Sequence, residues 1–199
     1  VYKRQGAASG AKQTVYLDNV RLPAFNLVGG ENNGWKVAGT HLELEHGLMQ
    51  SANAGQEFLN RIFRLCESQI RSGSRTKNDS EIKDFLADLY IDMQIGRLLN
   101  LRNFWIRATN RTLTYEGPQS YLHTKRSALR AAKLVQKMFG PQALIKDNLW
   151  ALDEGHIEAQ QRGAIVAQHP GGTVEIQKVI MARRLGIGRT TKEKAGVLR

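Results

Sequence analysis

Several residue types are scarce in this sequence, and each scarcity excludes a class of protein. A single cysteine, Cys66, rules out an internal disulfide framework and fits a reducing compartment. It falls within an apolar helical pattern, so we expect a buried structural thiol. No apolar run approaches the roughly 20 residues of a membrane span. The five histidines are scattered, and no pair has metal-ligand spacing, so no metal site is predicted.

Acidic residues are few relative to basic ones, and the net charge is +11. Such a balance is compatible with a nucleic-acid, anionic-membrane or phosphate-rich partner, or with an acidic part of the molecule that this chain does not include. One predicted helix carries five basic residues that could follow a phosphate backbone: Lys125, Arg126, Arg130, Lys133 and Lys137. They lack interleaved aromatics, and such a row is more often a solvated face, so a nucleic-acid partner is not favoured.

Apolar residues recur at three- and four-residue steps through most of the 199 residues. This spacing predicts helices over 35–72, 80–105, 118–139, 153–166 and 173–186. An Asp79-Ser80 cap begins the second helix, and Gly140-Pro141 ends the third. Long helices joined by short polar loops predict a mainly α fold, an antiparallel helical bundle.

The first 30 residues do not share this helical pattern. Residues 14–23 form a β-rich stretch that a proline ends. One strand cannot be stable alone, so its sheet must come from elsewhere. The sequence also has no initiator methionine and no apolar signal region. We therefore expect the C-terminal part of a longer protein, with residues 1–30 as the remnant of a β-domain and residues 31–199 as the bundle.

One carboxylate interrupts the apolar stripe of the first predicted helix. The stripe 35, 38, 42, 45, 49, 52 places Glu45 among apolar neighbours. A carboxylate on a core-facing stripe is costly unless it is paired or functional, and burial moves a carboxyl toward the pKa range of a general base. Two readings stay open: Glu45 is a general base, or it pairs with Arg97, Arg102 or Arg107 of a neighbouring helix.

Paired glycines precede the last predicted helix, in the run Pro170-Gly-Gly-Thr-Val-Glu-Ile-Gln177. Glycines at this position expose backbone N–H groups, which suit a phosphate or the polar edge of a ring. An ordinary glycine-rich helix start has the same pattern, so this motif alone does not choose between the two.

Several short motifs occur in an order known from one family. Val15-Tyr-Leu-Asp-Asn-Val-Arg-Leu-Pro23, Asn26-Leu-Val-Gly29 and Asn33-Gly-Trp35 come first, and Gly172-Thr-Val-Glu-Ile-Gln177 with Ala182-Arg-Arg-Leu185 comes last. The first group looks like the end of the middle β-domain of acyl-CoA dehydrogenases, and the second resembles that family's terminal signature. The resemblance extends from about residue 14 to residue 189.

The resemblance implies a tetrameric FAD enzyme, homomeric or heteromeric, of which this chain is the C-terminal bundle. Such enzymes remove the α-proton of an acyl-CoA thioester with a glutamate while the β-hydride passes to the flavin. The electrons then leave to an electron-transfer flavoprotein. The compartment expected for such a protein is the bacterial cytoplasm or the mitochondrial matrix.

The resemblance also assigns the base. Most members carry the glutamate just before the terminal Gly-Thr, where this sequence has Gly171. A minority, of the isovaleryl and long-chain type, carry it in the first bundle helix within Leu-x-Leu-Glu-Arg. Leu42-Glu-Leu-Glu-His46 resembles that stretch and puts Glu45 at the base position, with His46 replacing the arginine.

The flavin contacts follow from the same resemblance. Thr173 and Glu175 match positions that approach the isoalloxazine ring. Gln136 and Gly140 match a Gln-x-x-Gly-Gly loop that contacts the FAD of a neighbouring subunit, with Phe139 replacing its first glycine. The altered loop leaves a second reading open. The chain could be a catalytically weak subunit whose partner supplies the base or the complete flavin site, as in heteromeric relatives that act on bulky or steroid thioesters.

Overall fold

The computed structural model describes residues 3–5, 11–13, 15–46, 54–73, 80–147 and 149–188, with the backbone alone for 3–5, 11–13, 43–46 and 54. Helices dominate these residues, which confirms the mainly α fold class. The α-helices are α1 (Gly34–His46), α2 (Ala54–Arg71), α3 (Ser80–Ala108), α4 (Glu116–Phe139), α5 (His156–Val166) and α6 (Val174–Arg184). Short 3-10 helices are η1 (Ala24–Asn26), η2 (Gly140–Leu144) and η3 (Leu152–Gly155).

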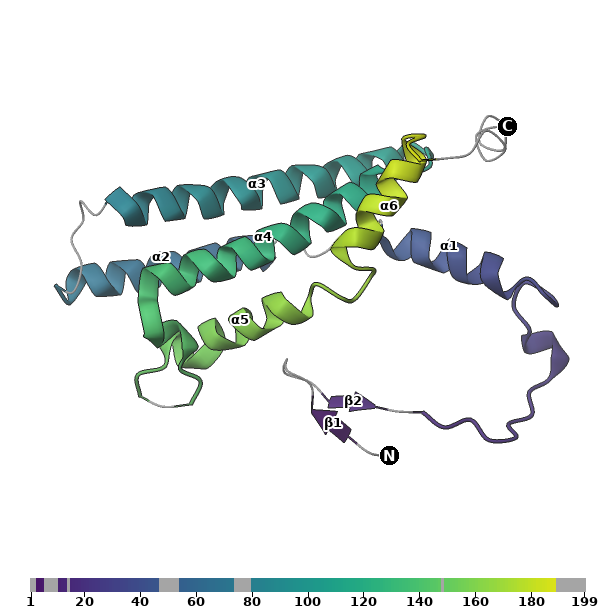
Figure 1. Ribbon diagram of the computed structural model, residues 1–199, viewed down its shortest axis with the longest axis horizontal. Coiled ribbons are helices and arrows are strands. Elements are labelled where there is room, and N and C mark those ends of the chain that lie inside the picture. Colours follow the sequence, from purple (N-terminus) through teal and green to yellow (C-terminus); the bar gives the residue numbers. More distant parts are fainter. Residues whose placement is uncertain are drawn as a thin grey trace.

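The long helices α2, α3 and α4 lie side by side, and each runs opposite to the one before it (Figure 1). Helix α4 is central, because it packs against α3, α5, α6 and α1. Helix α5 lies along one side of α4, and α6 crosses the end of α4 where that helix begins (Figure 1). The predicted antiparallel bundle is therefore formed, and α4 is the element that positions the turn before α6.

The core lies where α2, α3 and α4 meet, with α5 closing it. Leu59, Ile62 and Cys66 recur along one face of α2 and are buried, which confirms the expected structural thiol. Helix α4 contributes Val135 and Met138, both almost inaccessible to solvent. Each such side chain contributes about 1.5–3 kcal/mol by leaving water, so this cluster is the main anchor of the bundle.

The structure tests the expectations for the first 72 residues only in part. Helices α1 and α2 lie within the range 35–72 expected as one helix, and residues 47–53 between them lie outside the described residues. The strand expected over 14–23 is not formed at residues 15–23, which have no regular structure. Instead, β1 (Lys3–Gln5) pairs antiparallel with β2 (Ala11–Gln13). An isolated strand leaves its backbone groups without partners, so the β-rich pattern alone does not produce one.

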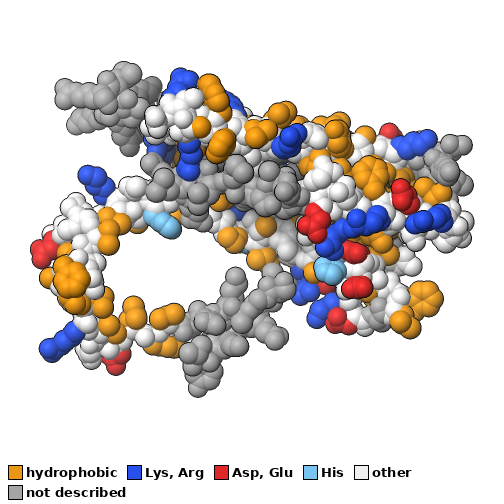
Figure 2. Space-filling view, turned by 180° about the vertical axis from the view of Figure 1, so that it is seen from behind, with side chains coloured by type: hydrophobic (Ala, Val, Ile, Leu, Met, Phe, Trp, Pro, Cys, Tyr) orange, Lys and Arg blue, Asp and Glu red, His pale blue; other side chains and the backbone are white. Residues whose placement is uncertain are grey.

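Many apolar side chains have no cover in the single chain. The segment 15–33 runs away from the bundle, and its apolar side chains stand free in the space-filling view (Figures 1 and 2). Helix α3 buries only part of its expected inward stripe. It buries Ile82 and Leu89, whereas Leu98 and Trp105, expected on the same stripe, are 61% and 55% exposed. Helix α3 therefore also presents an exposed apolar face to its surroundings.

Candidate active site

The turn before α6 forms as the terminal motif requires. Gly171 and Gly172 have backbone φ values of +66° and +84°, a left-handed conformation that glycine adopts without strain. Thr173 then caps α6, because its Oγ1 accepts a hydrogen bond from the Ile176 N–H at 3.3 Å. The first N–H groups of a helix have no backbone partner inside it, and in the first turn of α6 side chains accept some of them.

Glu175 lies next to Thr173 in the first turn of α6 and is exposed. The hydrogen bond from its own backbone N–H lowers the pKa of this carboxyl, and the Thr173 side chain lowers it further. Glu175 is consequently an anion at neutral pH and a stabilising charge at the positive end of the helix dipole. The structure thus brings the expected flavin contacts Thr173 and Glu175 together at one accessible helix start.

The other two expected flavin contacts lie elsewhere. Gln136 is exposed near the end of α4, and the Gly140 N–H donates to its carbonyl. Gly140 has a φ of +59°, and nothing lies within 4 Å of the place where a Cβ would stand. Phe139, which replaces the motif's first glycine, is buried in the core. The Lys125 Nζ donates to the Pro170 carbonyl just before α6, and Gln136 lies 11 residues further along α4, about 16 Å along the helix axis. This pair is therefore remote from the start of α6.

Glu45 belongs to α1, but its side chain lies outside the described side chains. The described part of its expected stripe does not face a core, since Trp35 is 85% exposed and Leu42 is also exposed. One ion-pair alternative has another role in the structure. Arg102 donates to the Tyr115 hydroxyl and to Gln119. The assignment of Glu45 therefore still depends on its match to the family motif.

Lys125 was expected on a solvated basic face, and this expectation is wrong. Its side chain is buried, and its Nζ donates to the carbonyls of Ala167 and Pro170 at 2.6 and 2.7 Å. Arg130 of the same row pairs with Asp88 at 2.7 Å. The basic residues of α4 therefore do not form the continuous free row that a phosphate backbone would follow.

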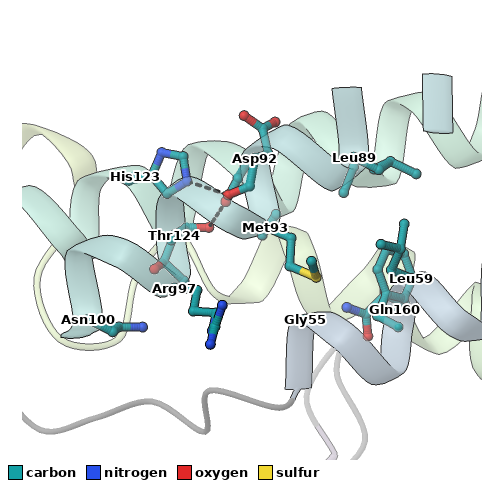
Figure 3. A pocket seen from close by; sticks show the side chains of 15 residues that line it. Gly55, Leu59, Leu89, Asp92, Met93, Arg97, Asn100, His123, Thr124 and Gln160 are labelled. Carbon is teal, nitrogen blue, oxygen red and sulfur yellow. Dashed lines mark hydrogen bonds between the residues drawn. The ribbon is translucent and has the colours of Figure 1, made fainter. Parts of the chain in front are cut away.

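A cavity of about 260 Å³ lies between α2, α3 and α4, and sequence reasoning missed it. Its wall is mostly apolar, with Phe58, Leu59, Leu89 and Met93 among the lining side chains. His123 lies at its polar end, where Nε2 donates to the Asp92 carbonyl at 2.8 Å, while the Asp92 carboxylate points away (Figure 3). Residues from several helices line it, so no short motif encodes it. Its shape and lining suit an apolar chain.

Metal ligands and membrane-spanning helices were both sought among the described residues. Among them, no group of three or more His, Cys, Asp or Glu side chains is placed to hold a metal ion. Over the same residues, every helix is too short or too polar to traverse a lipid bilayer.

Comparison with known proteins identifies the family. Residues 32–186 match the model of the acyl-CoA dehydrogenase C-terminal domain. The chain is 25% identical over 188 residues to the probable acyl-CoA dehydrogenase YngJ of Bacillus subtilis, covering 92% of this chain and 47% of that relative. It thus spans about half the length of the curated relatives that it matches.

Solved structures show the same fold. The ChsE4-ChsE5 complex from Mycobacterium tuberculosis contains a chain with a TM-score of 0.74 and 23% identity, over 88% of this chain and 46% of that one. The Tcur3481-Tcur3483 steroid ACAD matches with a TM-score of 0.72 and 22% identity, over 88% and 45%. On the strength of the match over residues 32–186, the chain belongs to the acyl-CoA dehydrogenase family and contains its C-terminal domain.

Proposed function

We propose that the whole protein is an FAD-dependent dehydrogenase that introduces an α,β double bond into an acyl-CoA thioester. The observation that carries this proposal is the match of residues 32–186 to the family's C-terminal domain. The formed and capped turn at Gly172-Thr173 supports it, because this turn is the terminal motif of that domain. In the same proposal, residues 1–30 are the end of a β-domain, and the compartment is the bacterial cytoplasm or the mitochondrial matrix.

Three parts of this chain would have separate roles in the reaction: a base, the start of α6 and an apolar wall. Glu45 on α1 removes the α-proton of the thioester, and Gly171, at the alternative base position, has no side chain that could do so. The chemistry that FAD would supply when bound is that of a β-hydride acceptor, with an electron-transfer flavoprotein as the partner for its electrons. The start of α6 orients a polar ring edge through Thr173 and the positive end of the helix dipole. The apolar wall near Phe58 and Met93 excludes water from an acyl chain.

The two separated flavin-contact regions fit a shared site between subunits. Thr173 and Glu175 would contact one flavin, and Gln136 and Gly140, at the far end of α4, would contact that of a neighbouring subunit. The open space beside Gly140 suits the close approach of a ligand to the backbone. Buried Phe139 leaves that approach free, because its side chain points into the core.

The test is the substitution Glu45→Gln in the whole protein, with Glu43→Gln on the same helix as control. We expect thioester-dependent bleaching of the flavin absorbance to slow by about 10²–10⁴-fold, the contribution typical of a positioned base. Flavin content should not change, and Glu43→Gln should behave as the unaltered protein. Undiminished bleaching in Glu45→Gln would remove Glu45 from the reaction.

A second candidate is a catalytically weak subunit of a heteromeric dehydrogenase. Two observations favour it: the replacement of a motif glycine by Phe139, and the likeness to chains of the ChsE4-ChsE5 complex and the Tcur3481-Tcur3483 steroid ACAD. The substrate would then be a bulky thioester, such as one with a steroid side chain. Activity of the protein expressed alone would refute this candidate, whereas activity only after co-expression with a neighbouring dehydrogenase gene product would support it.

A further inference from the structure

A buried lysine holds the backbone in front of α6. The Lys125 side chain is only 4% exposed, and burial lowers the pKa of its ammonium group. Among the described residues, no carboxylate forms an ion pair with it. A charge in this position is costly to bury without compensation, so the structure must offset the cost in another way.

The compensation comes from backbone carbonyls. Helix α5 ends at Val166, and the carbonyl of its C-cap residue Ala167 accepts one Lys125 N–H at 2.6 Å. The carbonyls at a helix C-terminus carry the negative end of the helix dipole, which favours a cation. A second N–H reaches the Pro170 carbonyl at 2.7 Å, beyond the end of α5. One ammonium group therefore joins the end of α5 to the start of the next turn.

Neighbouring side chains fix the same turn from both sides. Gln168 donates back to the Lys125 carbonyl at 3.0 Å, and Gln177 on α6 donates to the Gly171 carbonyl at 2.6 Å. The Tyr121 ring lies so close to Gly171 that an added Cβ would stand 2.7 Å from Cε1. A cavity of about 260 Å³ adjoins these residues. Packing alone would therefore leave the turn room to shift, and the hydrogen bonds must set its position.

We propose that Lys125 is a positioning residue of the site, which holds the turn from Pro170 to Thr173 so that the start of α6 is presented in one orientation. The inference rests on the proposed function for the statement that this orientation serves flavin and thioester. It does not require Lys125 to contact either of them. The anchoring itself rests on the contacts of α4 with the turn.

The test compares variants of the whole protein at position 125. Lys125→Met preserves side-chain length without a donor, whereas Lys125→Arg preserves charge and donors and can extend into the adjoining cavity. Lys133→Met, at an exposed lysine of the same helix, is the control. Amide hydrogen exchange of residues 167–177 should be about tenfold faster in Lys125→Met, as expected when a hydrogen bond from a charged donor is lost. Lys125→Arg should restore most of the protection.

The kinetic readout is kcat, which we expect to fall in Lys125→Met by more than KM changes, with flavin content retained. Comparing Lys125→Met with Lys125→Arg separates anchoring by hydrogen bonds from space filling. If Lys125 only filled space, Lys125→Met would retain more protection and kcat than Lys125→Arg. Protection that is unchanged in Lys125→Met, or lost without a fall in kcat, overturns the proposal. If Lys125→Met does not fold, Gln168→Leu supplies the test. It should speed exchange in the same segment by a smaller factor, and unchanged exchange there overturns the inference.

Hydrogen exchange also separates this inference from the proposed function, because it needs neither flavin nor substrate. If no thioester bleaches the unaltered protein, the proposed function fails, and the role of Lys125 in the reaction fails with it. The exchange comparison still decides whether Lys125 anchors the turn. If the unaltered protein does bleach while all variants exchange alike, only the inference about Lys125 fails.

Discussion

At the scale of single residues, Gly171 is a position that requires glycine, because its φ of +66° and the neighbouring Tyr121 ring both disfavour a side chain. We expect Gly171→Ala to lower the free energy of unfolding by about 2–4 kcal/mol, from backbone strain and overpacking together. Gly73→Ala is a matched control, since Gly73 has a φ of +75° with nothing within 4 Å of its added Cβ. It should cost only about 1–2 kcal/mol. Urea titration followed by circular dichroism measures both.

A second substitution separates the contribution of the Tyr121 ring to the destabilisation in Gly171→Ala from that of backbone strain. Shortening Tyr121 to leucine removes the Cε1 that the new methyl group would meet. Gly171→Ala should therefore be less destabilising in a Tyr121→Leu background than in the unaltered protein. Equal losses in the two backgrounds would show that backbone strain alone accounts for the effect.

Residue-level prediction from sequence succeeded where a motif is local. The start of α6 just after Gly171-Gly172-Thr173 and the buried Cys66 follow from spacing and neighbours, and both are confirmed. Lys125 and Gln177 were missed, because each is polar within a helix and its partners lie in other segments. Only contacts between distant parts of the chain reveal that such side chains point inward.

At the scale of elements, Glu116 fastens the connection between α3 and α4. The backbone N–H and the hydroxyl of Thr114 donate to its Oε2 at 2.8 and 3.0 Å, and Arg102 of α3 lies 3.6 Å from Oε1. Burial opposes ionisation of this carboxylate. The hydrogen bonds and the arginine outweigh that opposition, and the pKa of Glu116 lies below the ordinary value of a glutamate.

This shift makes stability depend on pH in a definite direction. Because the folded-state pKa is the lower one, the stability that Glu116 contributes is complete above the unfolded-state pKa and is lost as pH falls through the folded-state pKa. We expect the free energy of unfolding to decrease on acidification in this window, and less steeply in Glu116→Gln. Glu67→Gln, at an exposed glutamate of α2, controls for the removed charge. Identical acid slopes for Glu116→Gln and the unaltered protein would contradict the assignment.

Helix positions were largely predictable, whereas the orientation of their faces was not. Periodicity located α3, α4 and α6 to within a few residues, because caps and glycines mark their ends. In α6, however, Ile176 and Val179 are exposed and Gln177 is fully buried. An apolar stripe indicates that a face becomes covered, but it does not tell whether the same chain or another molecule covers it.

At the scale of the whole molecule, the exposed apolar face of α3 is a candidate subunit contact. Ile91, Ile95 and Leu98 lie on one face at helical spacing, and all are exposed. Apolar surface of this extent marks a contact with another chain or domain. If this face is a subunit contact of the tetramer that the family resemblance implies, Leu98→Glu buries an unpaired charge there. We therefore expect Leu98→Glu to shift the molar mass of the protein toward smaller species. Light scattering after gel filtration measures this, with Ser68→Glu, at an exposed polar site of α2, as control. A mass that stays unchanged in Leu98→Glu would place the subunit contacts elsewhere.

The Lys125 bonds also set an order of events during folding. They join residues 42 and 45 positions apart in sequence, so closing that loop costs entropy before any bond is gained. Helices α4 and α5 must be formed and docked before the lysine can reach both carbonyls. We therefore expect the turn to acquire its native conformation late in folding. A newly made chain would then gain an ordered start of α6 only after the bundle around it is complete.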